Sequence, residues 1–479
     1  MINQEIIVGA SLEKKVSLLA AMANRHGLIT GATGTGKTVT LQLLAESFAR
    51  LGVPVFAADI KGDLSGLAAT GSPHPKIEDR LKKIGLENFN FEASPSVFWD
   101  VYGEKGHPVR ITVSEMGPLL LSHVLELNEV QEGVIHVAFK LADEEGLLLL
   151  DLKDLRSLLE WLAENEEEVS AKYGRVSAQS IGAIQRRLLM LESAGGTVLF
   201  GEPALQIKDL LHRDFSGRAV ISVLEAGKLF NNPRVYTTFL LWLLSELFEE
   251  LPEVGDQELP KMIFFFDEAH LLFDQASKPL LERIEQVIRL IRSKGVGIFF
   301  VTQHPLDIPE SVLGQLGNRV QHALRAFTPK EKQAVKTAAN TFRQNPNFNA
   351  EEEITNLGVG EALVSTLDEK GVPTIVEKVL ISPPQSRIGA ISEQERISLI
   401  ERSPLKGVYD KIIDRESAYE VLQKRRKELA DKLETEASSK KKSNRQSASE
   451  AFLKSILRSV GSSIGRSIAR GVLGSVLRR

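Results

Sequence analysis

Short apolar runs and amphipathic stretches alternate near the start of the chain, and this alternation gives the first indication of the fold. The apolar run Gly27–Thr30 is followed by helical spacing of apolar residues from about Lys37 to Arg50. The fully apolar run Val53–Ala58 then ends at Asp59, as a strand buried on both faces of a parallel sheet does. The first 60 residues are therefore predicted to form a β-α-β unit.

The same alternation returns after residue 217. We predict strands at Arg218–Leu224, Met262–Asp267, Val296–Thr302 and Arg319–Leu324, helices at Val235–Leu251 and Pro279–Lys294, and a closing hairpin at Glu361–Thr366 and Thr374–Leu380. Such a series of strands and helices is typical of an α/β fold with a mainly parallel sheet. Pro383 and Pro384 end this globular part.

Between the two parts, residues 62–217 have mostly helical patterns. The predicted helices are Ile77–Ile84, Leu119–Ala142, Leu152–Asn165 and Ser177–Ser193, and the acidic residues Glu164, Glu166, Glu167 and Glu168 are predicted to lie on a solvated surface. A stretch of this length is far too long for a simple crossover connection. We therefore predict a large, mostly helical insertion at 62–217 in an α/β core made of 1–61 and 218–382. A charged helical extension is expected at 383–437, and a basic linker with an amphipathic helical tail at 438–479.

Composition narrows the class of protein. The chain has 479 residues, 43% of them hydrophobic, and no cysteine, which excludes disulfides, cysteine-ligated zinc and thiol catalysis. The N-terminus lacks the basic-then-apolar layout of a secretory leader. No apolar run reaches the ~18 residues of a membrane-spanning helix. We therefore expect a cytoplasmic protein.

Charge is distributed unevenly. The formal net charge is −4, yet residues 438–479 contain ten basic residues and one acidic residue, Glu450. In 450–479 the apolar and basic residues recur on opposite faces of a helix, while glycines such as Gly461 and Gly465 weaken an isolated helix by ~1 kcal/mol each. We expect this tail to become ordered on an anionic membrane, a partner helix or nucleic acid. The alternative is a disordered solubilising tail.

Gly31-Ala32-Thr33-Gly34-Thr35-Gly36-Lys37-Thr38 fits the phosphate-binding pattern G-x-x-x-x-G-K-[ST] without deviation. Glycines let the backbone amides surround phosphate oxygens, and the following helix presents its positive end to the same charge. Lys37 is predicted to reach the β- and γ-phosphates of ATP, and the Thr38 hydroxyl to ligate Mg²⁺. A strand directly before the motif and a helix directly after it strengthen this prediction.

A second motif is a strand that ends in two acids, Asp267 and Glu268. In the same sheet as a phosphate loop, Asp267 is expected to hold Mg²⁺ through its water shell, and Glu268 to polarise the attacking water. Because a glutamate follows the aspartate, water is a better candidate acceptor than a small molecule. The chain is therefore predicted to be an ATPase rather than a small-molecule kinase.

Asp267-Glu268-Ala269-His270, followed about 35 residues later by Thr302-Gln303-His304-Pro305, resembles the HerA/FtsK superfamily of ring-forming DNA pumps. Asp59-Ile60-Lys61-Gly62-Asp63 and Gly317-Asn318-Arg319-Val320-Gln321 fit it as well. The chain is most similar to the HerA-like bacterial family once defined only as a domain of unknown function. The resemblance covers Gly9 to about Ser382 and implies a RecA-like P-loop core.

The resemblance also implies roles for particular residues. Gln303, at the end of a strand between those of the phosphate loop and Asp267, resembles the polar sensor that contacts the γ-phosphate. Arg292 resembles the arginine that reaches the ATP of a neighbouring subunit, and Arg319 is an alternative for this role. A cation placed at a helix C-terminus because the dipole favours it remains the other explanation of Arg292.

Two functions follow from these patterns. The first is a homo-oligomeric motor that hydrolyses Mg·ATP and moves or remodels DNA, with a hexameric ring as the candidate arrangement. The second is an ATP-dependent assembly or membrane-surface factor that docks through the basic tail. Only 30 residues precede the phosphate loop, so we expect no counterpart of the N-terminal β-barrel of HerA, and the helical insertion has no counterpart that we can map.

Overall fold

The computed structural model describes residues 4–255, 257–273 and 278–440. They divide into two compact units, one formed by residues up to 110 together with 203–412, the other by 111–202 together with residues from 413 onward. Nearly all of the predicted basic tail, including the amphipathic segment 450–479, lies outside the described residues.

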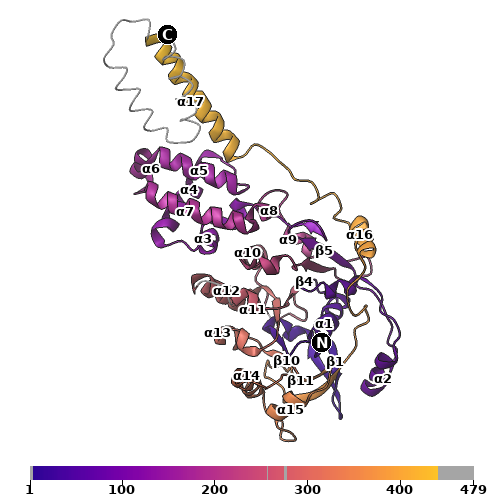
Figure 1. Cartoon of the computed structure of the whole chain (residues 1–479). Helices are drawn as coiled ribbons and strands as arrows, with labels where there is room; N and C mark the ends of the chain where they lie inside the picture. Colours follow the sequence, from indigo (N-terminus) through magenta and orange to yellow (C-terminus); the bar gives the residue numbers. More distant parts are fainter. Residues whose placement is uncertain (1–3, 256, 274–277, 441–479) are drawn as a thin grey trace. The chain divides into compact units, whose positions relative to one another are not determined.

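The first unit is built on one sheet of twelve strands, in the order β2-β1-β12-β11-β10-β3-β9-β8-β4-β7-β5-β6. Figure 1 labels β1, β4, β5, β10 and β11 of this sheet. The strands are β1 Glu5–Ala10, β2 Lys15–Leu19, β3 Gly27–Thr30, β4 Val55–Asp59, β5 Ser96–Asp100, β6 His107–Pro108, β7 Ile221–Glu225, β8 Met262–Phe266, β9 Val296–Thr302, β10 Asn318–His322, β11 Glu361–Ser365 and β12 Glu377–Ile381. From β10 to β6 every neighbouring pair is parallel, whereas β11, β12, β1 and β2 pair antiparallel. The mainly parallel α/β fold is confirmed.

Helices surround this sheet. They are α1 Lys37–Arg50, α2 Pro75–Ile84, α9 Ile207–Leu210, α10 Pro233–Glu250, α11 His270–Phe273, α12 Lys278–Ile291, α13 Glu310–Leu313, α14 Pro329–Asn340, α15 Ala350–Asn356 and α16 Glu393–Arg402. Leu41, Leu44 and Phe48 of α1 are fully buried and belong to one core cluster with residues of the central strands. Burial of these side chains, each contributing roughly 1.5–3 kcal/mol, fixes α1 and the loop before it on the sheet.

The second unit is helical. Its helices are α3 Val113–Val124, α4 Glu129–Glu145, α5 Leu152–Glu164, α6 Glu166–Tyr173, α7 Ala178–Leu191, α8 Thr197–Leu199 and α17 Ala418–Lys440. Helix α17 packs along α5, and Arg426 forms ion pairs with Glu160 and Glu164 (3.4 and 3.1 Å). Glu164 is therefore partly neutralised by α17 and does not lie on a purely solvated face.

The predicted insertion, 62–217, contains residues on both sides of 111–202, the part of it that belongs to this helical unit. Residues 62–110 and 203–217 belong to the first unit, where the apolar strand β5 pairs with β7. The single helix expected at Leu119–Ala142 is two helices, because the Asn128 side chain caps a new helix by accepting a hydrogen bond from the Gln131 N–H. The N-terminal hairpin of β1 and β2 is a feature that the apolar pattern did not reveal.

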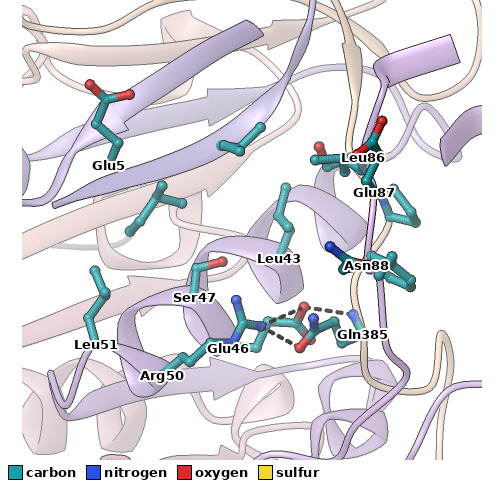
Figure 2. Close-up of a pocket in the computed structure, with 15 residues that line it drawn as sticks. Glu5, Leu43, Glu46, Ser47, Arg50, Leu51, Leu86, Glu87, Asn88 and Gln385 are labelled. Atoms are coloured by element: carbon teal, nitrogen blue, oxygen red, sulfur yellow. Dashed lines mark hydrogen bonds and ion pairs between the residues drawn. The ribbon is translucent and has the colours of Figure 1, made fainter. Parts of the chain in front are cut away.

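After β12 the chain passes along the C-terminal half of α1 (Figure 2). The buried Glu46 carboxylate accepts hydrogen bonds from the backbone N–H groups of Gln385 and Ser386 and from the Ser386 hydroxyl. A cavity of about 240 Å³ opens beside this contact, lined by residues of β1, α1, 86–89 and 382–385. The phosphate-loop sequence lies at the other end of α1, so this cavity is not the site predicted from the sequence.

Within the ranges given above, no helix has the length and apolar character needed to cross a membrane.

Candidate nucleotide site

The phosphate-loop sequence forms a tight backbone turn between β3 and α1. Gly31, Gly34 and Gly36 have φ angles of 153°, 78° and 118°, a region that residues with a side chain rarely adopt. A Cβ atom on Gly31 would lie only 2.5 Å from Cβ of His322. The Lys37 ammonium donates hydrogen bonds across the turn to the carbonyl oxygens of Gly31 (2.6 Å) and Ala32 (3.2 Å). These features together form a preorganised cradle for an anion.

Two segments distant in sequence support the cradle from behind. The Ala32 N–H donates to the Ala323 carbonyl (2.8 Å), and the Gly360 N–H donates to the Thr35 carbonyl (2.9 Å). Arg80 of α2 in turn donates to the carbonyl oxygen of Gly360 (2.8 Å). The loop conformation is therefore held by residues after β10 and before β11, and not by its own sequence alone.

His322 is the last residue of β10 and is fully buried beside the loop. Its Nδ1 lies 2.9 Å from the Glu361 carbonyl oxygen and its Nε2 2.9 Å from the Thr40 hydroxyl. Because a carbonyl can only accept, Nδ1 carries the proton and Nε2 accepts from Thr40. Burial lowers the pKa of His322 to about 4 against the raising effect of the Glu361 hydrogen bond, so the ring is neutral at pH 7.

The two acids predicted from the sequence lie at the carboxyl end of β8. Both Asp267 and Glu268 are buried, and burial, together with the Glu268 charge, raises the pKa of Asp267 to about 6. Glu268 has a φ of 48°, the left-handed region in which a residue with a long side chain is strained. Its Oε2 has no hydrogen-bond partner in the part of the chain described here, although His270 Nδ1 lies 3.6 Å away.

Glu268 Oε1, by contrast, is engaged by a lysine from the neighbouring strand end. Lys61 Nζ lies 2.6 Å from Glu268 Oε1. Burial would raise the pKa of Glu268, but the hydrogen bond and charge of Lys61 outweigh it and leave this pKa below its usual value. Lys61 follows β4, which is paired directly with β8. The turn that presents it is fixed by Asp59, whose carboxylate accepts from the N–H groups of Gly62 and Leu64 (2.8 and 2.9 Å).

The expected sensor and arginine residues occupy different positions around the sheet. Gln303 follows β9 directly, and β9 lies between β3 and β8 as the resemblance implied. Arg292 lies in the 3₁₀ turn Arg292–Lys294 after α12 and is exposed. Arg319 donates hydrogen bonds to the carbonyl oxygens of Leu313 and Leu316 (2.9 and 3.0 Å), which hold its guanidinium on its own chain.

Comparisons with known proteins identify the family and the fold of the chain. Residues 4–444 match the family described as Helicase HerA-like C-terminal. The chain belongs to this family. It is 22% identical over 379 residues to the DNA double-strand break repair helicase HerA of Sulfolobus acidocaldarius, covering 78% of this chain and 68% of that protein. The HerA of Sulfurisphaera tokodaii is 21% identical over 374 residues, with 75% and 65% covered, so the chain spans about two thirds of these relatives.

Solved structures share the fold of this HerA-like chain. The plasmid coupling protein TrwB in complex with a non-hydrolysable GTP analogue has a TM-score of 0.52 and 13% identity, covering 81% of this chain and 97% of its own. VirB4 of Thermoanaerobacter pseudethanolicus has a TM-score of 0.50 and 16% identity, covering 79% and 97%. At these identities the similarity establishes the RecA-like P-loop fold alone.

The site has the donors that a magnesium-bound triphosphate requires. Thr38 is the second residue of α1, next to the cradle, and Asp267 supplies a buried carboxylate whose pKa is raised by burial and by the Glu268 charge. Thr33 and Gly34 are exposed at the tip of the loop, where a ligand can reach the backbone amides. Oxygen ligands of this kind suit Mg²⁺. The residues present therefore fit a nucleotide and Mg²⁺.

Several residues of the site were not predicted as functional from the sequence. Lys61 stood in the motif Asp59–Asp63 that carried the resemblance, but nothing local indicated its partner. His322, Gly360 and Arg80 gave no signal, because their contacts join segments about 280 residues apart. A cation two residues after the strand-ending acid Asp59 is the one local pattern that could have drawn attention to Lys61.

Proposed function

We propose that this HerA-like protein is a homo-oligomeric motor that hydrolyses Mg·ATP and couples hydrolysis to the movement or remodelling of DNA. The observation that carries the proposal is that the preorganised cradle at Gly31–Thr38 lies close to the Glu268 carboxylate. The charges of Lys37 and Glu268 influence each other's pKa. An anion cradle and a buried carboxylate at neighbouring positions are what attack of water on a phosphate requires.

Each residue of the site has a role in this reaction. The backbone amides of Gly31–Thr38 bind the phosphates, and Lys37 exchanges its carbonyl partners for phosphate oxygens. Thr38 and Asp267 would hold Mg²⁺, which would neutralise charge on the phosphates when bound. Glu268 accepts the proton of the attacking water, and Gln303 orients the γ-phosphate.

The oligomeric state and the action on DNA are inferred from the relatives and from the position of Arg292. The two archaeal relatives are named DNA double-strand break repair helicases, and TrwB is named a plasmid coupling protein. Arg292 is exposed at the end of α12, where a cation can approach the nucleotide of an adjacent subunit. An arginine supplied in this way makes hydrolysis depend on oligomer formation, and a hexameric ring is the arrangement we propose.

The test compares ATP turnover by the unaltered protein, Lys37→Ala and Glu268→Gln, each with and without double-stranded and single-stranded DNA at low and moderate salt. We expect Glu268→Gln to bind ATP yet lose about 10²–10⁴-fold in turnover. DNA is expected to raise turnover of the unaltered protein alone. Equal turnover in all three proteins would refute the proposed ATPase activity. If turnover does not change with DNA but rises with anionic vesicles, and this rise requires residues 438–479, the membrane-surface function would be favoured over the DNA motor.

A further inference from the structure

Lys61 pairs with Oε1 of Glu268, the carboxylate proposed to activate water, while Oε2 has no hydrogen-bond partner among the described residues. We infer that Lys61 restrains Glu268 while the site lacks a triphosphate, and leaves it for the γ-phosphate when ATP binds. The inference rests on the proposed ATPase function and adds a residue that couples occupancy of the site to the availability of Glu268. The contact itself is an ion pair of 2.6 Å between Lys61 Nζ and Glu268 Oε1.

The two partners differ in how freely they can move. The Glu268 side chain is 6% exposed and the Lys61 side chain 40% exposed. The Lys61 backbone is fixed, because Asp59 binds the N–H groups of Gly62 and Leu64 and because Gly62 has a φ of 83°. Only the flexible side chain of Lys61 is left to move, and its four-carbon chain allows the ammonium to change partners with little cost in burial.

The electrostatics of the site favour such an exchange. Burial lowers the pKa of Lys37, the Glu268 charge opposes this effect, and the charge of Lys61 adds to it. Lys37 is the residue expected at the β- and γ-phosphates, so Lys61 lies near the same position. The phosphate oxygens of ATP bring more negative charge than a single carboxylate, and they compete for the Lys61 ammonium.

Release of Lys61 completes the chemistry at Glu268. The freed Oε1 accepts a proton from the attacking water while the water oxygen bonds to the γ-phosphorus. The bond from that phosphorus to the bridging oxygen of ADP breaks, and ADP and phosphate leave. Glu268 gives up its proton to the departing phosphate or to solvent, and Lys61 then returns to the regenerated carboxylate. A product site that holds ADP lacks the γ-phosphate and therefore keeps Glu268 restrained.

The experiment measures the dissociation constants of ADP and of a non-hydrolysable ATP analogue, with Mg²⁺, for the unaltered full chain and for Lys61→Met. We expect the analogue to bind about tenfold more weakly to Lys61→Met, a loss on the scale of one charged hydrogen bond. ADP affinity should change less than about twofold. Lys61→Arg, which retains the charge, should keep most of the preference for the analogue.

Lys105 provides a matched control. Its ammonium lies 3.5 Å from Glu225 Oε1 at the end of β7, and the two side chains are 48% and 9% exposed. Lys105→Met is expected to leave both affinities unchanged. If Lys61→Met weakens ADP and the analogue equally, or neither of them, the inference is wrong and the ion pair is only structural.

Failure of the proposed function has a different signature. An unaltered protein that binds neither ADP nor the analogue, or a Lys37→Ala variant that binds both normally, would refute the nucleotide site itself. A structure of the full chain with the ATP analogue gives a direct check. Lys61 Nζ should then contact a γ-phosphate oxygen, and a Lys61 that still contacts Glu268 Oε1 would contradict the inference.

Discussion

The Nε2 atom of His322 accepts a hydrogen bond from the Thr40 hydroxyl at 2.9 Å, and this contact joins the end of β10 to the helix that carries the phosphate loop. The other ring nitrogen donates to the Glu361 carbonyl at the start of β11. One neutral imidazole thus connects three elements around the site. A protonated ring would lose its only acceptor atom while remaining buried, so the contact depends on the charge state of His322.

Acid is therefore expected to destabilise the first unit. The folded-state pKa of His322, about 4, lies below its ordinary value of 6.5, so the unfolded chain binds a proton more readily. The stabilisation is complete above pH 6.5 and is lost as the pH falls from 6.5 towards 4. The urea concentration at the midpoint of unfolding should decrease when the pH is lowered from 7.5 to 5. The His322→Gln variant should show a smaller decrease.

His136 is the control for this measurement, because it is half exposed on α4 of the other unit. His136→Gln should retain the full pH dependence. His26 contributes a similar effect, since burial also lowers its pKa to about 4 and its ring bridges the Ile288 carbonyl and the Ile298 N–H. An unchanged slope in the His322→Gln, His26→Gln double variant would contradict the prediction.

Gly31→Ala is expected to abolish nucleotide binding. The added Cβ would lie 2.5 Å from Cβ of His322 and 2.9 Å from the Thr35 hydroxyl oxygen, and neither backbone can move without opening the cradle. Titration with a fluorescent ADP analogue should show at least about a hundredfold loss of affinity, equivalent to about 2.7 kcal/mol. Gly133→Ala is the control, since no described atom lies within 4 Å of its added Cβ. Tight binding by Gly31→Ala would show that the cradle tolerates a side chain.

Glu46→Ala should destabilise the first unit more than Glu46→Gln does. The alanine leaves the N–H groups of Gln385 and Ser386 without their acceptor, and each buried unpaired donor costs about 1–3 kcal/mol. Glutamine keeps one acceptor oxygen and removes a carboxylate whose pKa is raised by burial. Thermal unfolding of both variants measures the difference. Glu87→Ala, which removes an exposed acid from the same cavity, should behave like the unaltered protein.

Arg292→Ala should lose about 10³-fold or more in turnover while it still binds ATP, as expected of an arginine supplied by a neighbouring subunit. Mixing this variant with Lys37→Ala should restore part of the activity, because one subunit then provides the intact site and the other the arginine. Arg289→Ala, a change at an exposed arginine in the last turn of α12 just before Arg292, is the control and should remain active. No recovery in the mixture, with mixed oligomers demonstrated by mass, would exclude Arg292 from this role.

Local sequence determined much of the nucleotide site. Gly27–Thr30, Lys37–Arg50 and Val296–Thr302 have the bounds that the apolar periodicity and the glycines predicted. The reason is that strand and helix periods, helix stops and positive-φ turns are set by residues within a few positions of one another. The acids after β8 could be read in the same way, because a polar residue that ends an apolar strand is a local signal.

Tertiary structure alone decided which distant residues complete the site. Lys61 reaches Glu268 only because β4 pairs with β8, and His322 reaches Thr40 across 282 positions because β10 pairs with β3. Helix α17 likewise packs on α5, although more than 250 positions separate them in the sequence. The sequence carries the strands and the charges, but strand order arises from burial of the whole sheet. Pairings made by that order leave no pattern in the neighbouring residues.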